Sequence, residues 1–222
     1  ALGWVPFGKQ SRQVRGNIVT YCRRSFRFWE GKRPLPDEAK GGCFVEDARG
    51  RWYVCFYVES AEDRITGTGK LGLDLGLINL AACSTGEIIK APRHYRTLER
   101  KLAIAQLAGN RQRVRAIHAR IKNSRKDFIH KITSRMTKEN DTIVVGNINA
   151  ARHCRTWIAK SVYDAGWSKF CSALEYKARM HRARYVVVDE YMTSQVCSAC
   201  GALPEGRPKG IAGLGIREWE CS

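Results

Sequence analysis

The stretch LGLDLGL, residues 71–77, decides the fold of this chain. It has the composition of a buried strand, with one carboxylate at its centre. A lone carboxylate on a buried strand is costly unless it is paired or binds a metal. The glycine that follows would let a nucleic-acid backbone approach closely. Asp74 is therefore a candidate metal ligand, and the alternative is a partly exposed residue at a sheet edge.

Strand and helix signals continue after this stretch. Residues 80–83 and 87–90 flank a Ser-Thr-Gly turn, which predicts a hairpin. The apolar runs 142–145 and 185–188 are typical of buried strands, and residues 157–181 have helical spacing. The order strand, strand, strand, helices, strand, helix, strand predicts an α/β fold. Its sheet would be mixed, with parallel strands joined by crossover helices.

The N-terminal part, residues 1–68, has a different pattern. Residues 44–47 and 52–58 are strand-like and flank the turn Ala-Arg-Gly-Arg at 48–51, which predicts a hairpin. We therefore expect a small β-rich domain that ends in a short joint at residues 66–70. Its arginines and lysines could face a phosphate backbone, or they could lie on an ordinary solvated sheet face.

A basic helical hairpin is predicted at residues 93–140. Within 93–138 there are 14 Lys and Arg against two acids, a segment charge of +12, and Ala-Gly-Asn at 108–110 interrupts the helical pattern. An apolar seam with a cationic outer face suits contact with a nucleic-acid backbone, and the alternative is an ordinary solvated hairpin. The candidate contact residues are Arg111, Arg115, Lys122, Arg125, Lys126 and Lys131.

The charge of the whole chain also favours a nucleic-acid partner. Its net charge is +18, from 39 Lys and Arg against 21 Asp and Glu, which favours a polyanion partner. A merely basic, ribosome-like surface is the alternative. No apolar run approaches the roughly 20 residues of a membrane span, so we expect no membrane partner. Six scattered cysteines are typical of reduced thiols, which predicts a cytoplasmic protein.

The last cysteines have metal-ligand spacing. Cys197 and Cys200 form a C-x2-C knuckle, in which two thiolates point at one tetrahedral ion. Cys221 would open a second knuckle, but the sequence stops at Ser222, and it begins with Ala1 rather than Met. We therefore expect an incomplete zinc-binding domain at residues 195–222, in a fragment truncated at both ends. The alternative is a set of free thiols.

Several strings together resemble one known family. They are LGLDLG at 71–76, RKDFIHK at 125–131, LEYKA at 174–178, TSQVCSACG at 193–201 and GIREWEC at 215–221. This set is similar to the TnpB family, also called OrfB, of transposon-encoded RNA-guided nucleases, which is related to the compact type V CRISPR effectors. The string around the cysteines is the most specific of the five.

The resemblance implies a function as well as a fold. It implies a RuvC nuclease core of the ribonuclease-H-like fold at residues 69–92 and 141–194, interrupted by the basic hairpin. The implied activity is phosphodiester hydrolysis at a two-metal Mg²⁺ site. The implied partners are a guide RNA and a double-stranded DNA target, with base pairing reading the sequence while the protein holds the backbone. A structural Zn²⁺ would take its fourth ligand from beyond the fragment.

The chain departs from the family at one catalytic position. The family has three acids, and the first matches Asp74. The second is normally the Glu of a V-E-D-L-N string, but this chain has VGNIN at 145–149, which places Gly146 there. The third acid follows the second zinc knuckle.

Glu190 is the candidate replacement for the missing second acid. It follows the fifth strand, which in this fold lies beside the fourth, so it could reach the space that Gly146 leaves. Three interpretations stay open: a relocated catalytic acid, a surface acid without that role, or a lost catalytic centre. The last would make the protein a nuclease-dead RNA-guided DNA-binding protein or a decayed transposon product.

Overall fold

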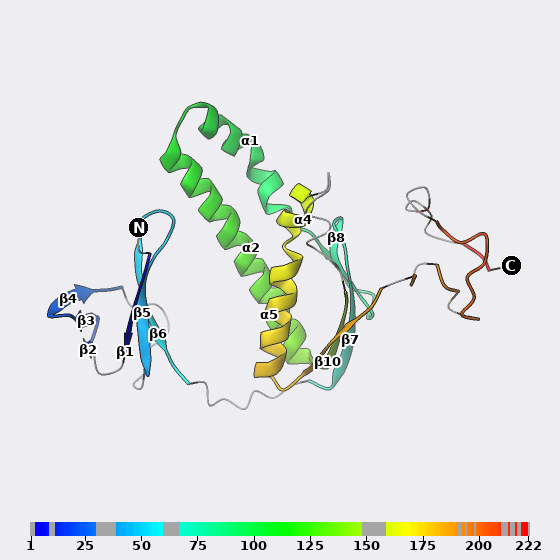
Figure 1. Cartoon of the computed structure of the whole chain (residues 1–222), viewed down its shortest axis with the longest axis horizontal. Helices are drawn as coiled ribbons and strands as arrows, with labels where there is room; N and C mark the ends of the chain where they lie inside the picture. The colour runs from blue at the N-terminus through cyan, green and yellow to red at the C-terminus, as the bar shows by residue number, and fades with distance from the viewer. Residues whose placement is uncertain are drawn as a thin grey trace. The chain divides into compact units, whose positions relative to one another are not determined.

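In the computed structural model the LGLDLGL stretch lies at the centre of a five-stranded sheet. The strand order is β11-β10-β7-β8-β9 (Figure 1). The strands are β7 (Gly69–Leu75), β8 (Asn79–Cys83), β9 (Ile88–Lys90), β10 (Asn140–Gly146) and β11 (Arg184–Val188). β10 runs parallel to both β7 and β11, whereas β7, β8 and β9 are antiparallel neighbours. The predicted α/β fold with a mixed sheet is confirmed.

The structure describes most of the chain, which divides into two units. The described residues are 3–8, 12–29, 39–59, 67–147, 159–190, 192–193, 195–197, 199–209, 213, 216 and 219–221. One unit consists of residues 1–65 and 93–131, and the other of residues 66–92 and 132–222. The second unit contains the five-stranded sheet.

The pleat of β7 decides where Asp74 points. Leu71, Leu73 and Leu75 are buried, whereas Lys70 and Asp74 are exposed and Gly72 is half-buried. Successive side chains of a strand point to opposite faces, so the leucines line the core and Asp74 lies on the other face. Asp74 is thus exposed, as in the alternative interpretation, but it lies on the central strand and not at an edge of the sheet. The glycines make the run look apolar throughout, although only every second residue contributes to the core.

Among the described residues between β10 and β11 there are two helices, where one was predicted. α4 (Ala159–Ala165) and α5 (Trp167–Met180) are separated by Gly166, whose φ of 70° breaks the helix. In α5 the side chains of Phe170, Leu174 and Ala178 recur every fourth residue and are fully buried. α5 contacts β11. Residues 157 and 158 of the predicted helix lie outside the described residues.

The basic segment forms the predicted helical hairpin. α1 (His94–Leu107) and α2 (Arg111–Glu139) are joined at residues 108–110, where Gly109 has a φ of 63°. Leu102 and Ala105 of α1 pack with Ile117 and Ile121 of α2 in one buried cluster. This cluster is the apolar seam that the sequence predicts. Among the described helices, none has the length and apolar character needed to cross a membrane.

The N-terminal unit contains two three-stranded sheets. Their orders are β1-β5-β6 and β2-β3-β4. The strands are β1 (Trp4–Gly8), β2 (Arg12–Arg15), β3 (Ile18–Tyr21), β4 (Arg24–Arg27), β5 (Gly41–Glu46) and β6 (Trp52–Tyr57). β5 and β6 form the predicted antiparallel hairpin.

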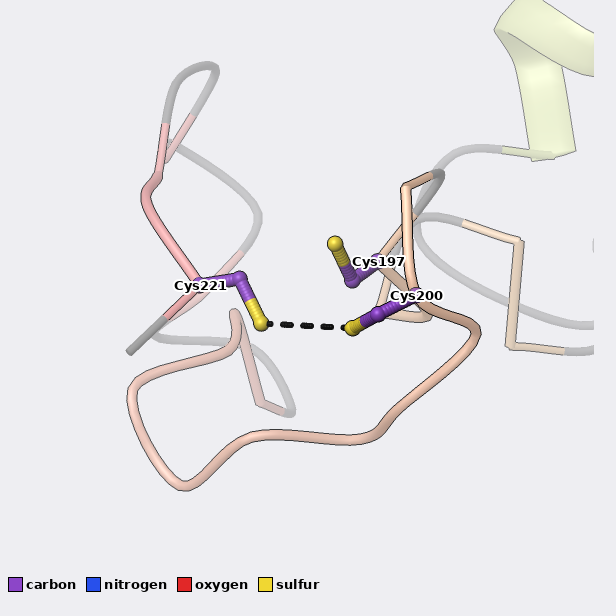
Figure 2. A group of neighbouring side chains, drawn as sticks. All are labelled: Cys197, Cys200 and Cys221. Carbon is purple, nitrogen blue, oxygen red and sulfur yellow. Dashed lines mark hydrogen bonds between the residues drawn. The ribbon is translucent and has the colours of Figure 1, made fainter.

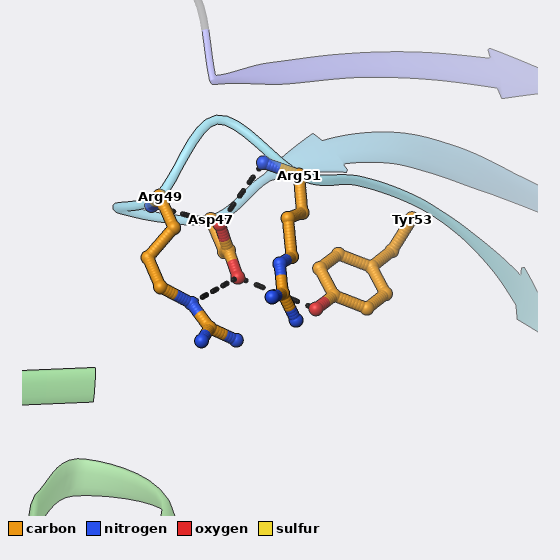
Figure 3. A network of polar contacts seen from close by, with 4 residues as sticks. All are labelled: Asp47, Arg49, Arg51 and Tyr53. Carbon is orange, nitrogen blue, oxygen red and sulfur yellow. Dashed lines mark hydrogen bonds and ion pairs between the residues drawn. The ribbon is translucent and has the colours of Figure 1, made fainter. Parts of the chain in front are cut away.

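The β5–β6 turn is organised by Asp47 (Figure 3). Its Oδ1 accepts the backbone N–H groups of Arg49 at 2.8 Å and Arg51 at 3.0 Å, and its Oδ2 accepts the Tyr53 hydroxyl at 3.3 Å. These donors, together with the nearby Arg49 side chain, hold the pKa of Asp47 below its usual value. Such a side-chain-to-backbone turn fixes the register of the hairpin.

Candidate acid pair and thiol cluster

The carboxyl ends of three strands meet at Gly146. Val145 pairs with Leu73 of β7, so the next residue, Gly146, lies beside Asp74. On its other side Gly146 pairs with Val188 of β11. Register neighbours in a parallel sheet share a face, so Asp74 and Gly146 are on the same side of the sheet. In open α/β sheets this edge, outside the carboxyl ends of the parallel strands, is where ligands bind.

The Glu190 side chain occupies the space above Gly146. A Cβ added to Gly146 would lie 1.4 Å from Oε1 of Glu190 and 2.3 Å from its Cδ. The backbone N–H of Asn147 donates to Val188 O at 2.7 Å, which extends the pairing with β11 one residue beyond the end of β10. The prediction that the fifth strand of the core, here β11, lies beside the fourth, here β10, is confirmed. Glu190 and a side chain at position 146 therefore exclude one another in this arrangement.

The pKa of Glu190 is affected by neighbouring carboxylates. Burial raises its pKa, and the charges of Asp74 and Asp189 raise it further. Nearby carboxylates repel one another when both are ionised, and a cation bound between them reduces this repulsion. Mg²⁺ prefers carboxylate oxygens and keeps several waters, so the pair Asp74 and Glu190 has the chemistry to hold it.

A turn that the sequence analysis overlooked follows Glu190. The backbone N–H and the hydroxyl of Thr193 donate to Glu190 O at 3.3 and 3.0 Å. The N–H groups of Gln195 and Val196 then donate to Met192 O at 2.8 and 2.9 Å. The Thr-Ser-Gln string just before Cys197 was the available signal, because threonine often caps a turn. These contacts order the chain between Glu190 and the cysteines.

The three predicted zinc ligands come together (Figure 2). The Sγ atoms of Cys197, Cys200 and Cys221 all lie within 4.8 Å of one another, and the Cys200 to Cys221 separation is 3.7 Å. A tetrahedral zinc ion with Zn–S bonds of about 2.3 Å has S···S edges of about 3.8 Å. The residues present therefore fit three corners of a zinc site.

Hydrogen bonds shape the loop around this cluster. Gly201, with φ of 71°, donates its N–H to Cys197 O at 2.9 Å and closes the knuckle. Nε of Arg207 donates to Oε1 of Gln195 at 3.2 Å, and its Nη1 donates to Leu203 O and Pro204 O at 3.1 and 3.0 Å. Arg207 thus ties the knuckle to the loop that follows it.

The pKa values of the thiols differ within the cluster. Backbone N–H groups of Cys200 and Ala199 lower the pKa of Cys197 to about 7. The neighbouring thiols Cys200 and Cys197 raise the pKa of Cys221 to about 11. Thiolates this close repel one another unless a cation lies between them, so ionisation of the third thiol and metal binding are linked.

The six predicted basic contact residues do not share one face of α2. At 100° per residue, Arg111, Arg115, Lys122 and Lys126 fall within about 60° of one another and are exposed. Arg125 is half-buried at the margin of this face. Lys131 points about 200° away from Arg111 and pairs with Asp127 at 2.8 Å. We call the four aligned residues, Arg111, Arg115, Lys122 and Lys126, the basic face of α2.

Comparisons with known proteins find two family models that match parts of the chain. The model of the OrfB family of IS605, described as "Probable transposase", matches residues 53–155. The model of the Cas12f1-like TNB domain matches residues 167–222. The chain is thus similar to the OrfB family over its middle part and to the TNB domain over its last part.

Individual relatives agree with this similarity. A "Putative RNA-guided DNA endonuclease" of Streptomyces pristinaespiralis is 34% identical over 209 residues, covering 85% of this chain and 50% of the relative. The "Putative RNA-guided DNA endonuclease InsQ" of Escherichia coli is 24% identical over 230 residues, covering 90% of this chain and 52% of the relative. The chain thus spans about half the length of these relatives.

A solved Cas12f1–sgRNA–target DNA complex is a more distant match. The alignment covers 90% of this chain and 56% of the solved chain, with 15% sequence identity and a TM-score of 0.45.

Proposed function

We propose that the full-length protein containing this chain is an RNA-guided, Mg²⁺-dependent DNA endonuclease with Asp74 and Glu190 as two of its metal ligands. The observation that carries the proposal is the fit of the Glu190 carboxylate into the space above Gly146, where a Cβ would lie 1.4 Å from Oε1. The family's usual glutamate is missing at that position, and another glutamate fills its place beside Asp74. The match to the OrfB model and the names of the relatives support the activity.

The sheet supports a RuvC core of the ribonuclease-H-like fold. That layout requires a central first strand bearing an acid, a hairpin on one side of it, and the fourth and fifth strands on the other. Here β7 bears Asp74, β8 and β9 form the hairpin, and β10 and β11 follow in parallel. The catalytic acids of such a core belong at the edge where Gly146 lies.

The proposed chemistry assigns a task to each residue at that edge. When bound, Mg²⁺ ions activate water and stabilise the leaving oxygen of a phosphodiester. Asp74 offers its carboxylate from the exposed face of the central strand, and Glu190 offers its own from two residues after the end of β11. Gly72, half-buried on the same face, leaves that face without a side chain next to Asp74. A third acid is expected after residue 222.

A nuclease-dead RNA-guided DNA-binding protein is the second candidate. The observation that favours it is that Gly146 and Asn147 supply no carboxylate where the family has one. Both candidates predict guide-dependent binding of target DNA, but only the endonuclease predicts Mg²⁺-dependent cutting.

One experiment separates the two candidates. The full-length protein, Asp74→Ala and Glu190→Gln are each assayed for guide-directed cleavage and for target binding. Cleavage by wild type that both variants lose, with target binding retained, supports the endonuclease with a relocated acid. Target binding without cleavage by wild type supports the DNA-binding protein.

We further propose that the basic face of α2 contacts the backbone of the guide RNA or the target DNA. Its four cations lie on one side of the helix and are exposed. Changing all four to Gln should reduce the slope of log affinity against log salt concentration by about 0.9 for each phosphate that is no longer neutralised. Arg113 and Arg120, exposed on the opposite side of the same helix, provide the control pair. If the slope falls by the same amount per removed charge in the four-residue variant and in the control variant, the basic face of α2 is not a specific contact face.

We also propose that Cys197, Cys200 and Cys221 hold a structural Zn²⁺ whose fourth ligand comes from beyond residue 222. Their sulfur separations support this assignment, as does the match to the TNB-domain model. Zinc content measured on the full-length protein tests the proposal, with Cys200→Ser as the variant expected to lose the metal.

A further inference from the structure

One buried side chain outside the acid pair holds the end of β7. Trp167, the first residue of α5, is 6% exposed. Its indole Nε1–H donates to the carbonyl oxygen of Gly76 at 3.1 Å, across 91 residues of sequence. Gly76 is two residues after Asp74. The indole therefore reaches the backbone directly beyond the strand that carries the first proposed metal ligand.

Gly76 is constrained from its other side as well. Its own N–H donates to Leu80 O at 3.2 Å, and a Cβ on it would lie 2.9 Å from Asn79 O. Both backbone polar groups of Gly76 are thus engaged within or across the turn between β7 and β8. Because the Trp167 bond is the one that comes from another element, it fixes where this turn sits against α5.

Trp167 and Asp74 differ in exposure. Asp74 is exposed between the buried Leu73 and Leu75, whereas the Trp167 side chain is buried. Gly166, with φ of 70°, separates α4 from α5, and Trp167 is the first residue of α5. The indole bonds to the Gly76 backbone two residues beyond Asp74, so we expect it to act on the carboxylate through the backbone.

We propose that Trp167 is a positioning residue for Asp74, and that its hydrogen bond to Gly76 holds the end of β7 in the geometry that metal binding needs. This inference rests on the proposed endonuclease function. A carboxylate on a strand has few rotamers, so its direction follows the backbone that carries it. Partners that orient metal ligands typically change metal affinity or activity by about 10- to 100-fold when they are removed.

The test compares two substitutions in α5 of the full-length protein. Trp167→Phe removes the indole N–H, and Phe170→Leu loosens the same helix at a fully buried position without touching Gly76. Trp167→Phe should raise the Mg²⁺ concentration for half-maximal cleavage roughly tenfold, the low end for such partners, with target binding unchanged. It should also speed amide hydrogen exchange across residues 75–80. Phe170→Leu should lower the melting temperature and leave both of these readouts at wild-type values.

Two results with the variants would overturn the proposal. One is the same Mg²⁺ requirement for both variants, and the other is unaltered exchange at residues 75–80 in Trp167→Phe. The unaltered protein gives a check that does not depend on a variant folding. With ¹⁵N-labelled tryptophan, the Trp167 indole N–H should exchange slowly, and fast exchange would also overturn the proposal. If wild type does not cleave, the proposed function fails, while the exchange measurements still decide whether Trp167 anchors the turn.

Discussion

The two candidate metal centres of this chain are built on different supports. The acid pair lies at the ends of hydrogen-bonded parallel strands, where the register of β7, β10 and β11 fixes the backbone around it. The three thiols lie in a loop whose described part is held by turns and by Arg207. The first support exists before any metal binds, whereas the second gains much of its order from the metal. Removing the metal should therefore affect the two centres differently.

The largest effect is expected from Asp74→Asn in the full-length protein. Metal-assisted stabilisation is worth several kcal/mol, so loss of this ligand should slow single-turnover cleavage on the order of a thousandfold or more. Because Asp74 is exposed and pairs with no core group, the melting temperature should stay close to that of wild type. Asp127→Asn, an exposed acid on α2, is the control. Undiminished cleavage by Asp74→Asn would remove the acid pair from the mechanism.

Zinc removal should give the next largest effect, confined to the loop. A chelator, or Cys200→Ser, should speed hydrogen exchange across residues 195–221 and leave β7 and β10 protected. The reason is that the sheet has ladder hydrogen bonds and a buried core, whereas the described part of the loop is held by turns and by Arg207. Simultaneous loss of protection in the sheet would contradict this expectation, because it would show that the two centres unfold as one cooperative unit.

Gly146→Ala should have a smaller effect on the acid pair. The new methyl group would displace the Glu190 side chain rather than the backbone, because the clashing atoms belong to a flexible carboxylate. Cleavage should fall roughly tenfold, as for the loss of a residue that orients a metal ligand, with little change in stability. Gly206→Ala is the matched control, since nothing lies within 4 Å of its added Cβ. Equal activity of the two variants would mean that the Glu190 position does not matter.

The smallest effect is expected from a change to a buried lysine in α5. Lys177 of α5 is 7% exposed and donates to the hydroxyls of Thr133 at 2.7 Å and Ser134 at 2.8 Å. Burial lowers its pKa below 10.5, so the folded protein releases this proton at a lower pH than the unfolded chain does. Stability should therefore rise with pH between the lowered folded value and 10.5. Lys177→Met should flatten that rise in the free energy of unfolding, and identical pH profiles would contradict the assignment.

The sequence predicted the arrangement of strands and helices well because each signal was local. The Ser-Thr-Gly turn marked the β8–β9 hairpin, and the interruption at residues 108–110 marked the join of α1 and α2. The exposure of Asp74 was left open by the sequence, because a Leu-Gly alternation looks uniformly apolar and does not show which face of the strand is covered. The Gly166 break was missed, since a single glycine in a helical pattern does not reveal its φ.

The candidate site was predictable only in part. The cysteine spacing and the family strings pointed to three thiols, and the departure at Gly146 pointed to Glu190. Their closeness could not be read from spacing, because Gly146 and Glu190 meet through the pairing of β10 with β11. The Trp167 bond to Gly76 joins residues 91 apart and has no local sequence signal. Such contacts depend on tertiary structure alone.

The most direct test of the central claim exchanges the two residues that exclude one another. Wild type, Glu190→Gly and the double variant Gly146→Glu with Glu190→Gly are compared in guide-directed, Mg²⁺-dependent cleavage by the full-length protein. The account predicts that wild type cuts, that Glu190→Gly fails while still binding its target, and that the double variant recovers cleavage because a carboxylate again lies beside Asp74. Full cleavage by Glu190→Gly would contradict it, and would show that the carboxylate above Gly146 is not part of the active centre.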